Sequence, residues 1–412
     1  MKILWVKSGP LFPLNTGGRR RTHAMLEELA KEHDVTYLAN LPEEQALASD
    51  EPGASYAQEK IWVRSREPRK GSPAFYRDLL ANLLFSTRPY VLDRYENEEL
   101  ADRILQLDAS GRFDLIVCDF LTPAVNFDFD RLRTPNILFQ HNVEAQIWKR
   151  LAGEKTNPVV RLYFRDQYRR MHEAERLLSR PFDGVVAVSE EDAAQFRDEY
   201  GLENVLGAVP TGVDTEFFRP PEPRTPEPGL IGFLGSMDWM PNIECVHHFV
   251  DDIFPRIRRE HPNARFRIIG RDPAPSVRAL AEKDETVEVT GTVDDVRPHL
   301  DACEVLVVPL RSGGGTRIKI FEAMAQGVPV VSTTIGAEGL PVTDGETILI
   351  ADEVGDLVMS VCRVLGEDEV GQRLSKYARV QLVARHGWST VTKLFLASLD
   401  SILFPRPNDG IE

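Results

Sequence analysis

The sequence predicts an α/β fold built as two domains, each around a parallel sheet. At 412 residues the chain exceeds the size of one ordinary core. Short, apolar, β-rich runs alternate with longer helical patterns along its whole length, as in strand–helix–strand units. A proline-rich stretch, "RPPEPRTPEPG", separates the two halves, because its prolines can continue neither a helix nor a central strand. Two Rossmann-like domains, 1–218 and 229–387, joined by a linker at 219–228, are therefore expected.

Thirteen apolar runs are the expected strands, and they fall into two series. In the first half they are "KILWV", "DVTYLA", "KIWV", "DLIVCD", "NILFQ", "GVVAVS" and "NVLGAV". In the second half they are "LIGFLG", "RFRIIG", "VEVTG", "EVLVVPL", "VPVVST" and "TILIA".

The composition argues against several classes of protein. A net charge of −15 lacks the basic footprint of general nucleic-acid binding. The four cysteines have no metal-ligand spacing, which favours free thiols in a reducing compartment. The first apolar run is too short for a signal peptide, and no stretch reaches the length of a membrane span. A cytoplasmic protein is the expectation.

Two glycine-rich segments each lead into a helix. Gly17 and Gly18 precede a helix with Met25, Leu26 and Leu29 on one side, an arrangement that presents free amides to an anion. The spacing matches neither G-x-G-x-x-G nor the P-loop, so a flexible turn is an equal alternative.

The second segment, "PLRSGGGTRIKIFEAMAQGVPVV", is more informative. Gly313, Gly314 and Gly315 are followed by Arg317 and Lys319, two cations at a helix start whose amides are already positive. Thr316, Lys319 and Glu322 fall on one stripe. Amides and cations at one end, with a carboxylate beyond, suit a phosphate and a sugar diol. The alternative is a solvated helix with a Lys–Glu pair, against which the three glycines count because of their entropy cost.

Several motifs together resemble glycosyltransferase family four, the retaining enzymes of the GT-B fold. They are "LIGFLGSMDWMPN", "PNARFRIIGRDP", the run from Val287 to Thr333 and "HGWS" in the second half, with "FPLNTGGRRRTH", "FQHNVE", "VVAVSEED" and "PTGVDTEFF" in the first. The resemblance covers nearly the whole chain and is most specific from Gly291 to Val331. It implies two Rossmann-like domains facing each other across a cleft, with residues 388–412 crossing back to the first domain.

The resemblance also implies roles for individual residues. Glu322 would bind the ribose hydroxyls of a nucleotide-sugar, and Arg317 and Lys319 would neutralise its diphosphate. Gly17 and Gly18 would bring amides to the same donor, and His141 would lie near the donor sugar. The base would lie by Thr292 and Val293.

The chain departs from the family pattern at two places. The first of the family's two glutamates is replaced by Gly314, so that sugar recognition would come from the amides of Gly313, Gly314 and Gly315, or from elsewhere. Where many members carry an arginine and a lysine, this chain has "GSMDWMPN". Arg317 and Lys319 would replace those cations.

The expected activity is a metal-independent, retaining transfer of a hexose-type sugar from a nucleotide diphosphate donor, such as a UDP- or GDP-sugar, without a bound cofactor. The expected acceptor is a glycan or glycolipid of bacterial surface or exopolysaccharide synthesis. Charge development on the departing phosphate explains the need for amides and cations. A double displacement would instead need a placed carboxylate such as Glu144 or Asp119.

Rival functions remain open at this point. They are a nucleotide-sugar-binding pseudoenzyme acting as a partner subunit, a GT-B epimerase or phosphorylase, and, more distantly, a dinucleotide oxidoreductase, which the absent G-x-G-x-x-G disfavours. The D-x-D tripeptide at Asp128 carries little weight as a metal motif.

Residues 145–180 are basic despite the acidic whole, with aromatic residues among the cations. One hypothesis is contact with an anionic membrane leaflet. A helix packed on the first domain with a charged outer face is the alternative. The segment "FYRDLLANLLFSTRPYVLDRY" has the same ambiguity.

Overall fold

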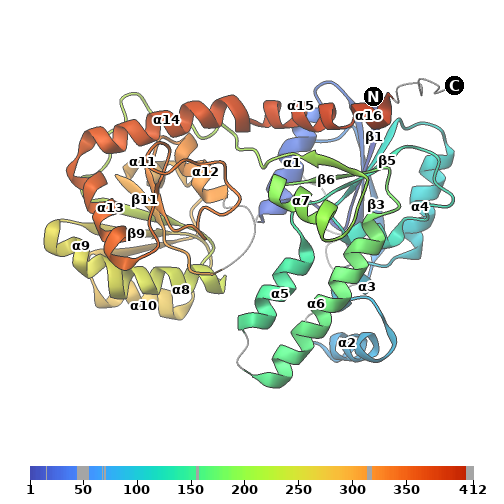
Figure 1. The fold of residues 1–412 in the computed structure, drawn as a ribbon, viewed down its shortest axis with the longest axis horizontal. Coiled ribbons are helices and arrows are strands. Elements are labelled where there is room, and N and C mark those ends of the chain that lie inside the picture. The colour runs from blue at the N-terminus through green and yellow to red at the C-terminus, as the bar shows by residue number, and fades with distance from the viewer. Residues whose placement is uncertain are drawn as a thin grey trace. The chain divides into compact units, whose positions relative to one another are not determined.

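The computed structural model describes residues 1–14, 16–43, 55–66, 68, 71–154, 157–312 and 318–404. The chain forms two compact units, one of Met1–Pro210 with Val391–Glu412 and one of Thr211–Thr390. Each unit consists of a parallel sheet and helices, which are labelled in Figure 1. The α/β class and the two parallel-sheet domains are therefore confirmed.

The first unit has a seven-stranded sheet in the order β3-β2-β1-β4-β5-β6-β7, with every pair parallel. All seven predicted strands of this half are present. Their bounds are β1 (Lys2–Lys7), β2 (Asp34–Pro42), β3 (Glu59–Ser65), β4 (Leu115–Asp119), β5 (Asn136–Phe139), β6 (Gly184–Ala187) and β7 (Val205–Ala208). The helices are α1 (Gly17–Leu29), α2 (Pro73–Phe85), α3 (Tyr90–Asp93), α4 (Glu98–Ala109), η2 (Thr122–Asn126), α5 (Glu144–Glu154), α6 (Pro158–Ser179), α7 (Glu190–Asp198) and, at the chain end, α16 (Asp400–Leu403).

The second unit has a six-stranded parallel sheet in the order β10-β9-β8-β11-β12-β13. Its strands also match the predicted runs: β8 (Leu230–Leu234), β9 (Arg265–Ile269), β10 (Val287–Gly291), β11 (Val305–Val308), β12 (Val330–Ser332) and β13 (Leu349–Ile350). The helices are α8 (Met240–His248), η3 (Phe249–Ile253), α9 (Phe254–Glu260), α10 (Pro275–Lys283), α11 (Arg297–Ala302), α12 (Ile318–Ala325), α13 (Val354–Gly366) and α14 (Asp368–His386).

The change of unit falls between Pro210 and Thr211, earlier than the proline-rich segment. The residues between Thr211 and the proline-rich segment already form hydrogen bonds with α14. The amide of Val213 donates to the carbonyl of His386 (2.8 Å), and Arg379 donates to the carbonyl of Phe218 (2.9 Å). Residues 219–228 therefore lie within the second unit.

The return to the first unit falls inside α15 (Trp388–Ser398), between Thr390 and Val391. Phe395 of this helix lies against Trp5 and Phe139, with ring centroids 5.9 and 5.1 Å apart. These three rings are buried. The last helical segment thus completes the core of the first unit.

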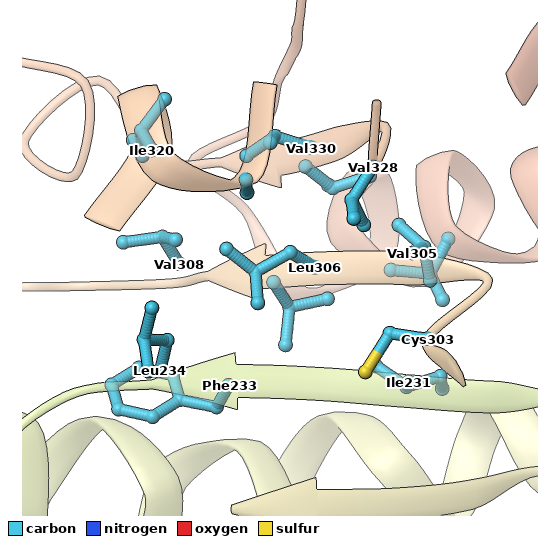
Figure 2. Close-up of a cluster of buried hydrophobic side chains, with 14 of the residues drawn as sticks. Ile231, Phe233, Leu234, Cys303, Val305, Leu306, Val308, Ile320, Val328 and Val330 are labelled. Carbon is cyan, nitrogen blue, oxygen red and sulfur yellow. The ribbon is translucent and has the colours of Figure 1, made fainter. Parts of the chain in front are cut away.

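The core of the second unit lies on both faces of its sheet, which is why its strands are apolar without alternation. Figure 2 shows side chains of β8, β11 and β12 in one apolar cluster with Ile320 of α12. Cys303 fills the space beside Gly232, where an added Cβ would lie 2.5 Å from its sulfur. All four cysteines are free thiols, as expected.

Among the described residues, no helix combines the length and the apolar character needed to cross a membrane.

Candidate functional site

Each sheet has one point at which the strand order reverses, and ligands of open α/β sheets bind outside the carboxyl ends of the strands there. In the first unit that point lies between β1 and β4, and in the second between β8 and β11. Polar side chains gather at both. They are described separately, as the first-unit site and the second-unit site.

Asp119, the last residue of β4, is the centre of the first-unit site. Its carboxylate is completely buried. Oδ1 lies 3.0 Å from the Lys7 ammonium and 2.6 Å from His141 Nε2. Oδ2 accepts hydrogen bonds from Thr22 (2.6 Å) and from the Trp5 indole (2.8 Å). With four neighbours and no exposed surface, Asp119 acts as an anchor for these side chains, not as a nucleophile open to a substrate.

The charges in this cluster set the protonation states. Burial alone would raise the pKa of Asp119, but the Lys7 ammonium, with His141 and Thr22, holds it well below its usual range. Burial lowers the pKa of His141 to about 4, even though the adjacent Asp119 carboxylate opposes the shift. His141 is therefore a neutral imidazole near pH 7. With Nε2 facing Asp119, its proton belongs on Nε2, which leaves a lone pair on Nδ1.

Nδ1 of His141 faces the start of α1. An added Cβ on Gly18 would lie 3.3 Å from this nitrogen. Gly17 and Gly18 are the first two residues of α1, after Thr16, whose hydroxyl caps the amide of Arg19. The first amides of a helix have no acceptor within it, so they can face an anion. The predicted pair of glycines and the predicted histidine thus lie together.

Glu175 of α6 holds the loop that carries His141 through hydrogen bonds. This fully buried carboxyl accepts hydrogen bonds from the amides of Glu144 (2.9 Å) and Ala145 (3.2 Å), at the start of α5, and from the hydroxyl of Tyr200 (2.9 Å). Burial raises the pKa of Glu175 to about 8 and that of Glu144 to about 7. The sequence did not predict this role of Glu175, because the residue lies in a helical segment with many charged residues and no pattern that singles it out.

Lys319 is the centre of the second-unit site. Its ammonium donates to Asn242 Oδ1 (2.9 Å) and lies 4.4 Å from the centre of the Phe233 ring. A Cβ on Gly235 would lie 2.8 Å from Lys319 Nζ and 2.7 Å from Asn242 Nδ2. The absence of a side chain at Gly235 therefore lets the cation reach the carboxyl end of β8, the loop where the chain lacks the usual arginine and lysine.

Glu322 lies one turn further along α12 and is only 6% exposed. Its neighbours on the helix are also buried: Ile320, Phe321, Ala323, Met324 and Ala325. The alternative of a solvated helix with a surface ion pair is wrong, because α12 is covered on almost every side. Burial of a carboxylate costs free energy unless it is partnered.

The two residues predicted to lie by the nucleotide base, Thr292 and Val293, lie in different surroundings. Thr292 lines a hollow beyond β9 and β10, together with Asp272, Arg278 and Gly291. Val293 packs against the core of the second unit instead. The polar side chains of this hollow, Asp272 and Arg278, were not predicted from the sequence.

Five predicted residues lie outside the described part of the chain: Gly313, Gly314, Gly315, Thr316 and Arg317. Three residues of the two sites were not predicted from the sequence. Lys7 and Thr22 belong to the first-unit site, and Asn242 belongs to the second-unit site. Lys7 had a readable signal, since it is a lysine at the carboxyl end of an otherwise apolar strand.

Two family models match the chain, one in each unit. Residues 15–217 match Glycosyltransferase Family 4, and residues 228–367 match Glycosyl transferases group 1. Together they cover most of the sequence, including the second-unit site and the first-unit site apart from Trp5 and Lys7.

Among curated proteins, the chain is 20% identical over 367 residues to an uncharacterized 44.6 kDa protein in the cps region of Klebsiella pneumoniae, covering 85% of this chain and 88% of that one. It is 28% identical to a GDP-mannose-dependent phosphatidylinositol monomannoside mannosyltransferase of Mycobacterium tuberculosis, over 53% of this chain and 62% of that one.

Solved structures share the fold. Sucrose-phosphate synthase from Thermosynechococcus elongatus superposes with a TM-score of 0.69 at 17% identity, covering 98% of this chain and 99% of that one. Anabaena HepE in complex with UDP and glucose gives 0.64 at 14% identity, covering 97% and 100%. The chain therefore belongs to the glycosyltransferases of the GT-B type, with a family 4 domain followed by a group 1 domain.

Proposed function

We propose that this glycosyltransferase moves a hexose-type sugar from a nucleoside diphosphate donor to a glycan or glycolipid of the bacterial cell surface, with retention of the anomeric configuration. The observation that carries the proposal is the position of Lys319 at the reversal point of the second sheet, beside Gly235. A cation at this edge suits the diphosphate of a nucleotide.

In this proposal the second unit binds the leaving nucleotide. Lys319, together with Arg317, neutralises the diphosphate, and Glu322 accepts hydrogen bonds from the ribose hydroxyls. The amides of Gly313–Gly315 and the hydroxyl of Thr316 complete the donor site, and Thr292 lies by the base. Fixed positive charge lowers the barrier most where negative charge grows, which is on the departing phosphate.

The first unit orients the sugar. A neutral His141 with a lone pair on Nδ1 accepts a hydrogen bond from a sugar hydroxyl, and the first amides of α1 at Gly17 and Gly18 face the phosphate side of the donor. Asp119 is sequestered by its four neighbours, so a double displacement through this carboxylate is disfavoured. The mechanism proposed here is attack on the face of the departing phosphate.

The acceptor class rests on the named relatives. One is a protein in a cps region, and another is a phosphatidylinositol monomannoside mannosyltransferase. A lipid-linked or surface glycan acceptor, met at the inner face of the membrane, is the corresponding proposal here. The nucleotide is left open between uridine and guanosine, since UDP and GDP-mannose both occur among the relatives and solved structures.

Thermal unfolding with UDP, GDP, ADP, dTDP and NAD tests the donor class. A ligand at a hundred times its dissociation constant stabilises the protein by about 2.7 kcal/mol. One nucleoside diphosphate should raise the melting temperature of the wild type but not of Lys319→Ala. Lys376→Ala, which removes an exposed lysine of α14, is the matched control and should keep the shift.

Stabilisation by NAD alone would refute the proposal. Where a nucleotide binds, the anomeric configuration of the transferred sugar, read by NMR from product made with the matching donor, tests retention. An inverted product would refute that part.

A further inference from the structure

Glu175 contacts both ends of the short loop that carries His141. The loop joins the end of β5 to the start of α5. At its near end, the side chain of Gln140 donates to Glu175 Oε1 over a long 3.5 Å. At its far end, the amides of Glu144 and Ala145 donate to Oε1 (2.9 Å) and Oε2 (3.2 Å). One carboxyl group therefore holds the chain on both sides of the histidine.

The contact replaces a helix cap that the loop itself lacks. The first amides of a helix have no acceptor within it, and a polar side chain just before the helix usually provides one. The residue before α5 is Val143, whose side chain has no acceptor. Glu175 provides the acceptors instead, from α6. An apolar residue in its place would leave the amide of the buried Ala145 without a partner.

Glu175 is itself held in place by its surroundings. It is completely buried, and Tyr200 donates its hydroxyl to Oε2 (2.9 Å). The ring of Tyr200 packs against His172 of α6 and Phe196 of α7, with ring centroids 4.5 and 5.5 Å apart. The helices α5 and α6 also pack against each other, as Figure 1 shows. The carboxyl group is therefore a fixed point to which the loop is attached.

His141 cannot move far without losing its contacts. Its Nε2 lies 2.6 Å from Asp119 Oδ1, and its Nδ1 lies 3.3 Å from the position of a Cβ added to Gly18. A displacement of the loop by about 1 Å would stretch the first distance beyond the range of a good hydrogen bond. The ring could then turn, and the lone pair of Nδ1 would no longer face the start of α1.

We propose that Glu175 is a positioning residue for sugar transfer. By holding both ends of the loop, it keeps the Nδ1 lone pair of His141 directed at a hydroxyl of the donor sugar. Because Glu175 is completely buried, it acts through the loop and not by contact with the substrate. A misplacement of about 1 Å can cost about a hundredfold in rate. The inference rests on the proposed function, in which His141 accepts a hydrogen bond from that hydroxyl.

NMR of the histidine rings tests the position of His141 without any substrate. In protein with 15N-labelled imidazoles, the His141 signal is identified by its loss in His141→Gln. In the wild type we expect a proton on Nε2 alone and no titration between about pH 6 and 8, because the pKa of His141 is lowered to about 4. In Glu175→Ala the released ring should carry its proton on either nitrogen, and its pKa should rise toward 6.5.

Three further variants show whether the effect belongs to the hydrogen bonds of Glu175. Glu175→Gln keeps an acceptor oxygen and the size of the side chain, so it should retain the wild-type signal. Glu173→Ala is the matched control, because Glu173 lies on the same helix but is exposed and pairs with Arg176 (2.7 Å). Tyr200→Phe removes one hydroxyl from Glu175 and should change the signal in the same direction as Glu175→Ala, but less. It replaces Glu175→Ala in the test if that variant does not fold.

Hydrolysis of the donor without an acceptor separates positioning from nucleotide binding. The donors are UDP-glucose and GDP-mannose. Glu175→Ala should lower kcat about a hundredfold and leave KM unchanged, because the nucleotide is bound by the second unit, and Glu175→Gln should recover most of kcat. Lys319→Ala should instead raise KM. Hydrolysis of neither donor by the wild type would count against the proposed function, while the His141 signal would still decide the role of Glu175.

Two outcomes would overturn the proposal. The first is a wild-type His141 signal in folded Glu175→Ala, which would mean that other contacts hold the loop. The second is a changed His141 signal with an unchanged kcat, which would mean that the position of the histidine does not matter for the reaction of the donor.

Discussion

Asp119 and Lys7 should be energetically coupled, and a double-mutant cycle can measure the coupling. The two charges lie 3.0 Å apart, with side chains 0% and 11% exposed. At an effective dielectric constant of about 20, their attraction is about 5 kcal/mol. Desolvation offsets much of it, but removing one member of a buried pair strands the other and costs about 3–5 kcal/mol.

The cycle uses Asp119→Asn, which keeps an acceptor for Thr22 and Trp5, and Lys7→Met, which keeps the length of the side chain. Each single variant should lower the opening free energy of β1 and β4 by about 3 kcal/mol or more. The double variant, which buries no unpaired charge, should lose less than the sum of the two, by about 2 kcal/mol.

Hydrogen exchange of the amides in β1 and β4 is the appropriate assay. A chain of two units need not unfold in one step, so a single melting temperature would mix the two. Exchange reports the opening of the first unit by itself, and each tenfold loss of protection corresponds to about 1.4 kcal/mol. Costs that add within about 0.5 kcal/mol would refute the coupling, and with it the view of Asp119 as the anchor of this site.

Three further outcomes follow from single contacts. Gly235→Ala should displace the ammonium of Lys319 and weaken nucleoside diphosphate binding roughly tenfold or more by calorimetry, whereas Gly355→Ala, whose added Cβ meets nothing within 4 Å, should not; equal affinities would contradict the role of the close approach. The pKa of Glu175 is raised to about 8, above its unfolded value, so its contribution to stability is full below pH 4.5 and is lost as the pH rises toward 8. Glu175→Gln, which cannot ionise, should therefore gain on the wild type by about 3 kcal/mol between pH 4.5 and 7 in hydrogen exchange of the first unit, and a pH-independent difference would show that Glu175 is ionised in the fold. Arg170→Met should speed exchange at the end of α2 roughly tenfold or more, because charged hydrogen bonds to its carbonyls are lost, and unchanged exchange would mean that α2 is held by other contacts.

The sequence by itself determined the sheets. Every apolar run that predicted a strand forms one. Strands buried on both faces of a parallel sheet, such as β4, need an uninterrupted apolar run, and such runs are readable locally. A helix beside the glycine pair was also readable, although α1 begins at Gly17 itself and so includes the two glycines that were expected to precede it. The family matches agree with the motifs that suggested them.

The tertiary structure alone decided which polar side chains meet. Lys7, Asp119 and His141 lie apart in the chain and become neighbours because β4 pairs with β1 on one side and with β5 on the other. In the same way, Lys319 reaches Asn242 because β8 and β11 are adjacent. Strand order is a property of the whole domain, and no local pattern encodes it.

Burial was likewise decided by packing. A surface pair of Lys319 and Glu322 stayed open as the less favoured alternative from the sequence, and the cover over α12 excludes a solvated pair. In α2 the amphipathic pattern predicts a helix but not which side faces inward, because periodicity is the same for either orientation. Asn82 and Arg170 settle it, through hydrogen bonds to partners that the sequence does not place beside them.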